Sequence, residues 1–291
     1  MSLCTLIYHN IFDDDADLAY DPFGIAVTRS TFVSHLKMLK SRYQLVSQAQ
    51  ITEAINPDTV LGGMDCILLT IDDGYAQGIL TAAEVLREMG ERALAFIPPA
   101  HIDSAGHRYW WDILADGMAS ERISVFEGMA MQGSATRMPY IEAEEFVRGV
   151  TGGDVGCSKR FELARWETLR IAHDVFDYGV HGLRHDCFSA VHWSQLRADL
   201  TMAKERLIAE NCGAPVALAY PYGDAAAVTK EQVEHAVTNQ FELAFTATKG
   251  AVVGQSRSNV LLLPRCFVSN CPSERLNDQI QRRFSSALQS Q

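Results

Sequence analysis

Two adjacent carboxylates, Asp72 and Asp73, follow the apolar run 66–71 and precede Gly74. Their like charges repel each other, so we expect a neighbouring cation that makes the pair tolerable. Successive side chains on a regular strand point to opposite faces, but glycine permits backbone angles that other residues avoid. We therefore expect the strand to end at Asp72 and both carboxylates to reach one mouth. The alternative is a solvated turn after a strand.

A second pair, His181 and His185, lies in the stretch HGLRH. On a helical turn a spacing of four places both imidazoles on one face, which suits a metal ion. The alternative is one exposed histidine and one that is satisfied in the core. The pair follows an apolar run and precedes a long helical stretch, a position that favours a role in the site.

Two imidazoles and one carboxylate form a three-ligand set for a divalent cation and leave one position open for water. We predict Asp73, His181 and His185 as these ligands, with Zn²⁺ as the default ion and Co²⁺ or Ni²⁺ as alternatives. The cation would neutralise one carboxylate and leave Asp72 beside the bound water, where a general base belongs.

The stretch AYPYGD contains a third signal. Pro221 and Gly223 flank Tyr222 and predict a rigid turn directly after an apolar run. A backbone N–H in such a turn can bind a developing oxyanion. The alternative is an ordinary connection between a strand and a loop.

Apolar runs of strand length alternate with stretches of helical period. The strand-like runs are 5–9, 66–71, 93–97, 175–181, 216–221, 242–248 and 260–268. The helical stretches are 30–42, 78–90, 189–213 and 229–240. This alternation predicts parallel strands in an α/β fold, and about seven such units favour closure into a barrel. In such barrels the chemistry lies at the C-terminal strand ends. The polar residues expected there are His9, Asp72, Asp73, His181, Tyr222 and Arg265.

The segment from about 100 to 162 fits this alternation less well, and we interpret it as an insertion with its own helices within a single domain, 1–291. Trp110, Trp111 and Asp112 are candidates for a wall on which a sugar ring stacks, and packing inside the insertion is the alternative. Trp166 is expected in the core. Surface or structural roles are expected for His101, His107, His173, His192 and His235.

Composition narrows the class of protein. The net charge is −11 and the basic residues are scattered, which argues against a nucleic-acid partner. No apolar stretch approaches the length of a membrane span, and the first residues lack the features of a signal peptide. Seven cysteines without close pairing indicate a reducing compartment. These features predict a cytoplasmic protein, with removal of a native leader as the alternative. They carry no signal for an oligomeric state.

The ordered motifs TIDDGY, HGLRH, AYPYGD and LLLPRC resemble those of the NodB-homology polysaccharide deacetylases, also called carbohydrate esterase family 4. The opening LIYHNI and the stretch ELARWETLRIAHDVFDYGVH resemble the branch whose third motif reads YPYG. The resemblance covers nearly the whole chain, least well at 100–162. It implies a distorted (β/α)7 barrel and metal-dependent removal of acetyl groups from an N-acetylated saccharide.

The resemblance also implies roles for individual residues. It makes Asp72 the base, Asp73 a metal ligand together with the two histidines, and Tyr222 the source of an oxyanion N–H. In the last motif Arg265 replaces a histidine that often protonates the leaving amine. Arginine does not release its proton near neutral pH, so we expect Arg265 to orient Asp72.

Other departures from the family pattern are Ile71 for phenylalanine, Gly182 for a hydroxyl residue, and Ala219 and Tyr220 in the region where an arginine is common. The proton donor is then open. His9 is one candidate because it ends the first strand, although it could instead cap that strand; Asp72 acting as both base and acid is the other candidate.

Two further functions stay open at this point. One is a carbon–nitrogen hydrolase of the same fold that acts on a small non-sugar amide or imide. The other is a saccharide-binding relative without catalysis, which the missing histidine of the last motif supports.

Overall fold

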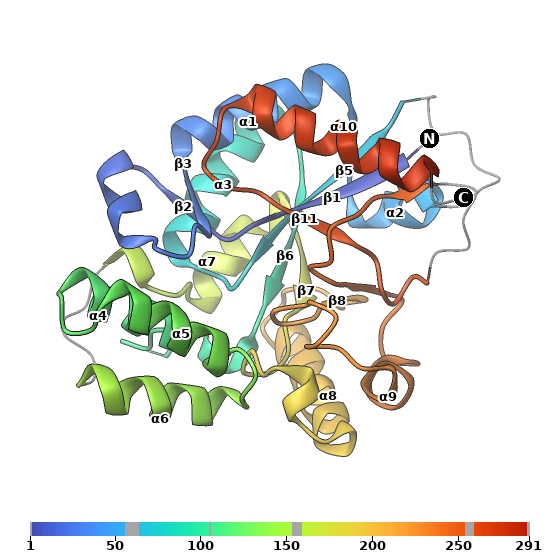
Figure 1. Ribbon diagram of the computed structural model, residues 1–291. Coiled ribbons are helices and arrows are strands. Elements are labelled where there is room, and N and C mark those ends of the chain that lie inside the picture. Colours follow the sequence, from blue (N-terminus) through green and yellow to red (C-terminus); the bar gives the residue numbers. More distant parts are fainter. Residues whose placement is uncertain (1, 56–63, 105, 153–158, 254–258, 290–291) are drawn as a thin grey trace.

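The computed structural model of the 291-residue chain describes residues 2–55, 64–104, 106–152, 159–253 and 259–289. Strands occupy the centre and helices surround them (Figure 1). Cys157 lies outside these ranges, and the six described cysteines are buried free thiols. None of the described helices combines the length and hydropathy needed to cross a membrane.

Seven parallel strands form the central barrel. They are β1 (Ser2–Tyr8), β5 (Cys66–Asp72), β6 (Ala93–Ile97), β7 (Phe176–Val180), β8 (Ala217–Ala219), β9 (Leu243–Phe245) and β11 (Arg265–Phe267). Neighbours pair in the order β1, β5, β6, β7, β8, β9. The ring closes because β11 pairs in parallel with β1, and Leu263 bridges Phe245 of β9. The predicted α/β fold with a distorted (β/α)7 barrel is confirmed.

The barrel strands are apolar because both of their faces are covered. Every residue of β1, β5 and β6 is buried, as expected for parallel strands between an interior and a helical layer. In β5, Leu68 packs in an apolar cluster made mostly of strand residues. Leu69 packs in a different cluster, which also includes side chains of the surrounding helices. Thr70 and Asp72 lie on the same face as Leu68, so Asp72 points into the barrel.

Helices surround the barrel, and four of them match predicted stretches. The surrounding helices are α1 (Arg29–Arg42), α2 (Gln48–Ile55), α3 (Ala76–Met89), α7 (Trp166–Ile171), α8 (Trp193–Ala209), α9 (Lys230–Gln232, followed by a π-helical turn Val233–Val237) and α10 (Ser273–Gln289). The four that match are α1, α3, α8 and α9. Helices α2 and α10 were not predicted, although α10 buries Leu276, Ile280 and Phe284 at a spacing of four.

Short elements that the sequence analysis missed complete the fold. Strands β4 (Gln44–Val46) and β10 (Val252–Val253) pair with β5 and β1, and β2 (Asn10–Phe12) and β3 (Ala26–Thr28) form a separate two-stranded sheet. Single 3₁₀ turns are Asp15–Tyr20, Pro99–His101, Lys159–Phe161, Ala172–Asp174 and Phe188–Ala190. Each strand has only two or three residues, too few for a recognisable period.

The connection from β6 to β7 contains the expected helices, α4 (Trp110–Ala119), α5 (Val125–Ala135) and α6 (Tyr140–Thr151). They lie together beside the barrel (Figure 1). Their apolar side chains form a cluster of their own that includes Trp110, Leu114 and Tyr140 and extends to Phe12 and Tyr75. The helices thus pack against β2 and against the residue that precedes α3. That the chain forms a single domain stays a prediction.

Candidate active site

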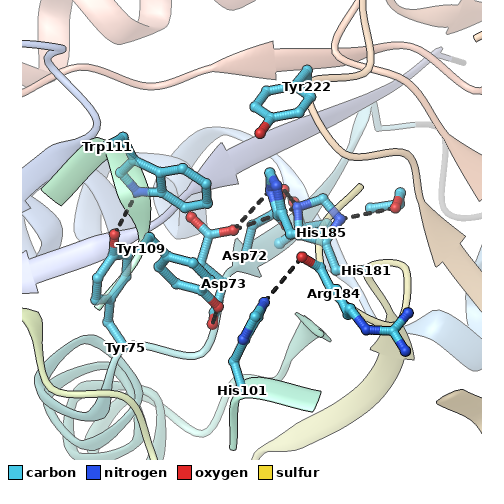
Figure 2. A network of polar contacts seen from close by, with 12 residues as sticks. Asp72, Asp73, Tyr75, His101, Tyr109, Trp111, His181, Arg184, His185 and Tyr222 are labelled. Atoms are coloured by element: carbon cyan, nitrogen blue, oxygen red, sulfur yellow. Dashed lines mark hydrogen bonds and ion pairs between the residues drawn. The ribbon is translucent and has the colours of Figure 1, made fainter. Parts of the chain in front are cut away.

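Three potential metal ligands converge at the C-terminal mouth of the barrel (Figure 2). Oδ1 of Asp73 lies 3.4 Å from Nε2 of His185 and 3.5 Å from Nε2 of His181. The three ligand atoms all lie within 4.8 Å of one another, and the three side chains are buried. The structure therefore brings together the residues that the sequence nominated as ligands.

The local backbone explains how both carboxylates reach this mouth. Strand β5 ends at Asp72, and the N–H of Asp73 still donates to the carbonyl of Phe96. Asp73 has φ of 73° and Gly74 has φ of 75°. Both are left-handed, a conformation that glycine adopts freely and aspartate tolerates. The expectation of a strand end at Asp72 is confirmed, and the turn uses Asp73 as well as Gly74.

The two histidines do not lie on a helical turn, so that expectation was wrong. Gly182 and His185 have φ of 70° and 64°, and left-handed residues cannot continue a right-handed helix. The chain instead makes a non-helical turn that places the imidazole centroids 4.6 Å apart. The spacing of four residues correctly predicted that the two imidazoles lie close together, but not the backbone conformation between them.

The orientation of His181 leaves a lone pair for a metal. Its Nδ1 lies 2.8 Å from the carbonyl oxygen of Ala219. Because a carbonyl only accepts hydrogen bonds, Nδ1 carries the proton and Nε2, which faces Asp73, is unprotonated. Burial lowers the pKa of His181 to about 4, so the imidazole is neutral at neutral pH.

Asp72 is paired with Arg265 in the barrel interior. Nη1 and Nη2 of Arg265 each donate to one carboxylate oxygen, both at 2.8 Å, and the arginine is 1% exposed. Its other donors go to Thr70 Oγ1 and to the carbonyl of Thr246, both at 3.1 Å. Burial alone would raise the pKa of Asp72, but Arg265, followed by His181, lowers it below its ordinary value.

Arg265 does not sit at a C-terminal strand end as expected. It is the first residue of β11, which is shorter than the predicted run 260–268. Pro264 precedes it and has no N–H to donate to a strand ladder. The length of the arginine side chain lets it reach Asp72 from the start of the strand.

Tyr222 has φ of 60° and directly precedes Gly223, which also has φ of 60°. A Cβ at Gly223 would lie 2.5 Å from the amide nitrogen of Ala247, so only glycine fits there. The Tyr222 ring lies 4.8 Å from that of His185, edge to face. Among the described residues its amide N–H donates to no protein acceptor and is therefore available to a ligand.

His9 follows β1 and lines the same cavity as Asp72 and Asp73. Its ring packs 5.4 Å from that of Phe267. Its Nδ1 is buried and, within the described part of the chain, has no hydrogen-bond partner. The residue is thus placed beside the site without a hydrogen bond that would identify it as a cap of the strand.

The ligand cluster fits a divalent cation. Oδ1 of Asp73 is buried, has no hydrogen-bond partner among the described residues, and faces Nε2 of both His181 and His185. Oδ1 of Asp73 and the unprotonated Nε2 of His181 are two converging acceptors, which are costly in a buried site unless a cation binds them. Ligands bound to zinc at 2.0–2.1 Å in a tetrahedron lie about 3.3–3.4 Å apart, and the distances of 3.4 and 3.5 Å match this.

A cavity of about 180 Å³ leads to these residues. Its lining includes all seven predicted site residues, which are His9, Asp72, Asp73, His181, His185, Tyr222 and Arg265. The sequence analysis missed the wall residues Phe23, Ile25, Gln132, Thr136 and Phe267. Only Phe267 had a signal, because it follows the motif LLLPRC; the others belong to segments without a motif.

Trp110 and Trp111 belong both to the apolar core of the insertion and to the wall of the cavity. Trp110 and Trp111 are 1% and 7% exposed and pack in the insertion cluster, yet both line the cavity. Asp112 does not join them, because its carboxylate accepts hydrogen bonds from Tyr75 Oη at 2.9 and 3.1 Å, away from the cavity. Trp166 is in the core, as predicted.

The five histidines for which surface or structural roles were predicted divide into two groups. His173, His192 and His235 are exposed, as predicted. His101 is buried and its Nε2 lies 3.0 Å from the carbonyl of Arg184, so it has a structural role beneath the turn that carries His181 and His185. His107 stacks on it at 4.3 Å.

Comparison with known proteins identifies the family. A family model described as polysaccharide deacetylase matches residues 62–240. The chain therefore belongs to the polysaccharide deacetylase family.

Solved structures show the same fold at low sequence identity. A polysaccharide deacetylase from Bacillus cereus is 15% identical with a TM-score of 0.65, covering 96% of this chain and 69% of that chain. The Streptococcus pyogenes deacetylase PplD, solved with acetate, is 14% identical with a TM-score of 0.65 and coverage of 96% and 98%. A de-N-acetylase from Aggregatibacter actinomycetemcomitans is 14% identical with a TM-score of 0.65 and coverage of 97% and 99%. No curated protein matched the chain.

Proposed function

We propose that the chain is a metal-dependent hydrolase that removes N-acetyl groups from a polysaccharide or oligosaccharide and releases an amine and acetate. The observation that carries this proposal is the buried cluster of Asp73, His181 and His185 beside the Asp72–Arg265 pair. Membership of the polysaccharide deacetylase family supports the acetylated saccharide as substrate. The similar fold of a de-N-acetylase supports the acetamide as the reacting group.

Asp73, His181 and His185 would hold the divalent ion, with Zn²⁺ as the default and Co²⁺ or Ni²⁺ as alternatives. When bound, such an ion polarises a carbonyl oxygen and makes a water more acidic. The protein prepares this site by keeping the imidazole of His181 neutral, with Nε2 directed at Asp73.

Asp72 is the proposed base. Its carboxylate is ionised at neutral pH and held in one orientation by two hydrogen bonds from Arg265. It accepts a proton from the water that attacks the acetamide carbonyl carbon. The unpaired amide N–H of Tyr222 then donates to the carbonyl oxygen as negative charge develops there. The orientation of Asp72 is thus the task of Arg265.

The carbon–nitrogen bond breaks when the amine nitrogen receives a proton. His9 is the proposed donor because its side chain lines the cavity together with Asp72 and Asp73. Return of the proton from Asp72 is the competing route. Either route releases acetate and leaves a free amine on the sugar. The products therefore do not distinguish the two routes, whereas a variant of His9 does.

The size of the cavity favours a second candidate function on the same scaffold. Its volume of about 180 Å³ is below the 300–1,000 Å³ of typical small-molecule sites. A substrate that must enter it is a small amide or imide, or one sugar unit at a time. The alternative is therefore a carbon–nitrogen hydrolase for small non-sugar amides or imides.

Metal analysis combined with an acetate-release assay tests the proposal. N-acetylated chito-oligosaccharides and small cyclic amides are offered side by side to the protein with and without bound Zn²⁺. We expect acetate release from the saccharides that disappears in the variants His181→Ala and His185→Ala. Equal acetate release by the metal-free protein would overturn the metal dependence. Saccharide binding without acetate release at any metal loading would identify a non-catalytic relative.

A further inference from the structure

We infer that the segment Tyr109–Trp111 of the insertion is a positioning element for the metal site, an inference that rests on the proposed function. Three site residues, Asp73, His185 and Tyr222, have left-handed backbones, with φ of 73°, 64° and 60°. This conformation is unfavourable for residues other than glycine and persists only where surrounding structure stabilises it. The three consecutive aromatic side chains each contact one of these residues.

Tyr109 contacts Asp73. Its Oη donates to the main-chain carbonyl of Asp73 at 2.7 Å, and the tyrosine is fully buried. The ring stacks on Trp111 with centroids 4.3 Å apart and 12° between the planes. The donor is therefore held in place by its own packing and fixes the carbonyl of the left-handed residue. Figure 2 shows Tyr109 directly beside Asp73.

Trp110 contacts Tyr222. Its Nε1–H donates to the Tyr222 hydroxyl at 3.2 Å, and the indole is 1% exposed. The Tyr222 ring lies edge to face with His185 at 4.8 Å. The hydrogen bond thus holds the side chain of the left-handed residue whose amide N–H is the proposed oxyanion donor.

Trp111 contacts His185, with ring centroids 4.8 Å apart. Its Nε1–H donates to Tyr75 Oη at 2.8 Å, which fixes the plane of the indole. Nδ1 of His185 is buried and has no hydrogen-bond partner among the described residues. A metal-binding histidine normally has its ring oriented by a hydrogen bond at its other nitrogen, as His181 has. For His185 the packing of Trp111 and Tyr222 takes that role.

The substitution Tyr109→Phe removes one hydrogen bond without changing the shape of the ring. Tyr178→Phe is the matched control, because Tyr178 is buried and its Oη donates to the carbonyl of Leu169 at 2.7 Å, away from the cavity. Both variants lose a buried hydrogen bond to a main-chain carbonyl. A purely structural role predicts the same behaviour for both, and a positioning role predicts a difference at the site.

We expect Tyr109→Phe to weaken Zn²⁺ binding about 10- to 100-fold in competition with a chelator, and Tyr178→Phe to leave it unchanged. In the metal-free proteins we expect the amide hydrogen of Asp73, bonded to Phe96, to exchange about five- to tenfold faster in Tyr109→Phe only. The pair Trp111→Leu and Trp166→Leu repeats the comparison for a buried indole, since Trp166 lies in the main core.

The outcomes separate this inference from the proposed function. If the wild-type protein binds no divalent metal, the proposed function fails, while the exchange comparison still tests the positioning role. If the wild type binds Zn²⁺ and Tyr109→Phe matches Tyr178→Phe in both affinity and exchange, the positioning role is overturned. A loss of affinity confined to Tyr109→Phe and Trp111→Leu supports it.

Discussion

Arg265 and Asp72, which are 193 positions apart in the sequence, form a bidentate ion pair inside the barrel, with both hydrogen bonds at 2.8 Å. The orientation of the guanidinium is also fixed by hydrogen bonds to Thr70 and to the carbonyl of Thr246. Removal of one member of a buried pair leaves the other charge without a partner, which is strongly destabilising. The pair therefore offers the first test.

We expect Arg265→Met to lower the free energy of unfolding by about 3–5 kcal/mol. The lowered pKa of Asp72 contributes stability above its unfolded pKa, and this is lost as the pH falls through the folded pKa. Without Arg265, burial raises the folded pKa of Asp72 above its unfolded value, so protonation of Asp72 restores part of the variant's lost stability as the pH falls, the opposite of the wild-type dependence. Chemical denaturation across a pH series measures both effects. Arg265→Lys keeps the charge but not the two parallel hydrogen bonds, so its free energy of unfolding should lie between those of the wild type and Arg265→Met. A free energy of unfolding of Arg265→Met equal to that of the wild type would contradict the prediction.

A second prediction concerns the proton donor. We expect His9→Gln to lower kcat for acetate release about 10²- to 10⁴-fold, because general acid catalysis contributes this much. Zn²⁺ content and KM should stay unchanged, since His9 is not among the clustered ligands. Steady-state kinetics with metal analysis measures this. Full retention of kcat would show that the proton returns from Asp72, and Asp72→Asn should be inactive in either case.

Metal removal is the third test. Chelation should lower the melting temperature, and added Zn²⁺ should restore it, because a ligand at 100 times its Kd stabilises the folded state by about 2.7 kcal/mol. Thermal unfolding with and without Zn²⁺ measures the shift. His181→Ala should show little or no shift, because it lacks one of the three clustered ligands. An equal shift in this variant would place the binding site elsewhere.

The burial of His101 predicts a dependence of stability on pH. His101 stacks on His107 with 5° between the rings, and burial, followed by His107, lowers the pKa of His101 to about 3. The unfolded chain therefore binds the proton more readily, and this contribution to stability is present above the ordinary pKa of 6.5 and lost as the pH falls toward about 3. Between pH 6.5 and 4 we expect a loss on the order of 3 kcal/mol from this group.

His101→Gln keeps a donor for the carbonyl of Arg184 but does not titrate, so its stability should change less over this pH range. Denaturation of the metal-free protein at several pH values measures the slope. His192→Gln, at an exposed position, is the control and should keep the wild-type slope. The prediction is wrong if all three proteins show the same slope.

The fifth prediction concerns substrate recognition by the insertion. Gln132 of α5 lines the cavity, and its side chain has no hydrogen-bond partner among the described residues. An amide in that position can hydrogen-bond a sugar hydroxyl, so we expect Gln132→Ala to raise KM for an N-acetylated oligosaccharide about 3- to 10-fold with little change in kcat. Ser134→Ala, on the exposed side of the same helix, is the control. Kinetics that are identical in both variants would remove Gln132 from the substrate site.

The sequence by itself determined the barrel and the identity of the clustered residues. Parallel strands that are covered on both faces are continuous apolar runs, so all seven barrel strands could be located, although with approximate ends. The residues in TIDDGY, HGLRH and AYPYGD lie just beyond three of these strands, and parallel strands bring such positions to one mouth. Helix α10 was also present as a stripe of Leu276, Ile280 and Phe284, which the sequence analysis overlooked.

Tertiary structure alone decided the relationships that depend on closure of the barrel and docking of the insertion. The hydrogen bonds from Arg265 to Asp72 require β11 to pair with β1 beside β5. The left-handed turn at His185 has no local signal, because the energy that stabilises it comes from rings distant in the chain, among them Trp111. The local sequence sets the secondary-structure preference of each segment. These contacts instead join segments that are distant in the chain and that come together only in the folded barrel.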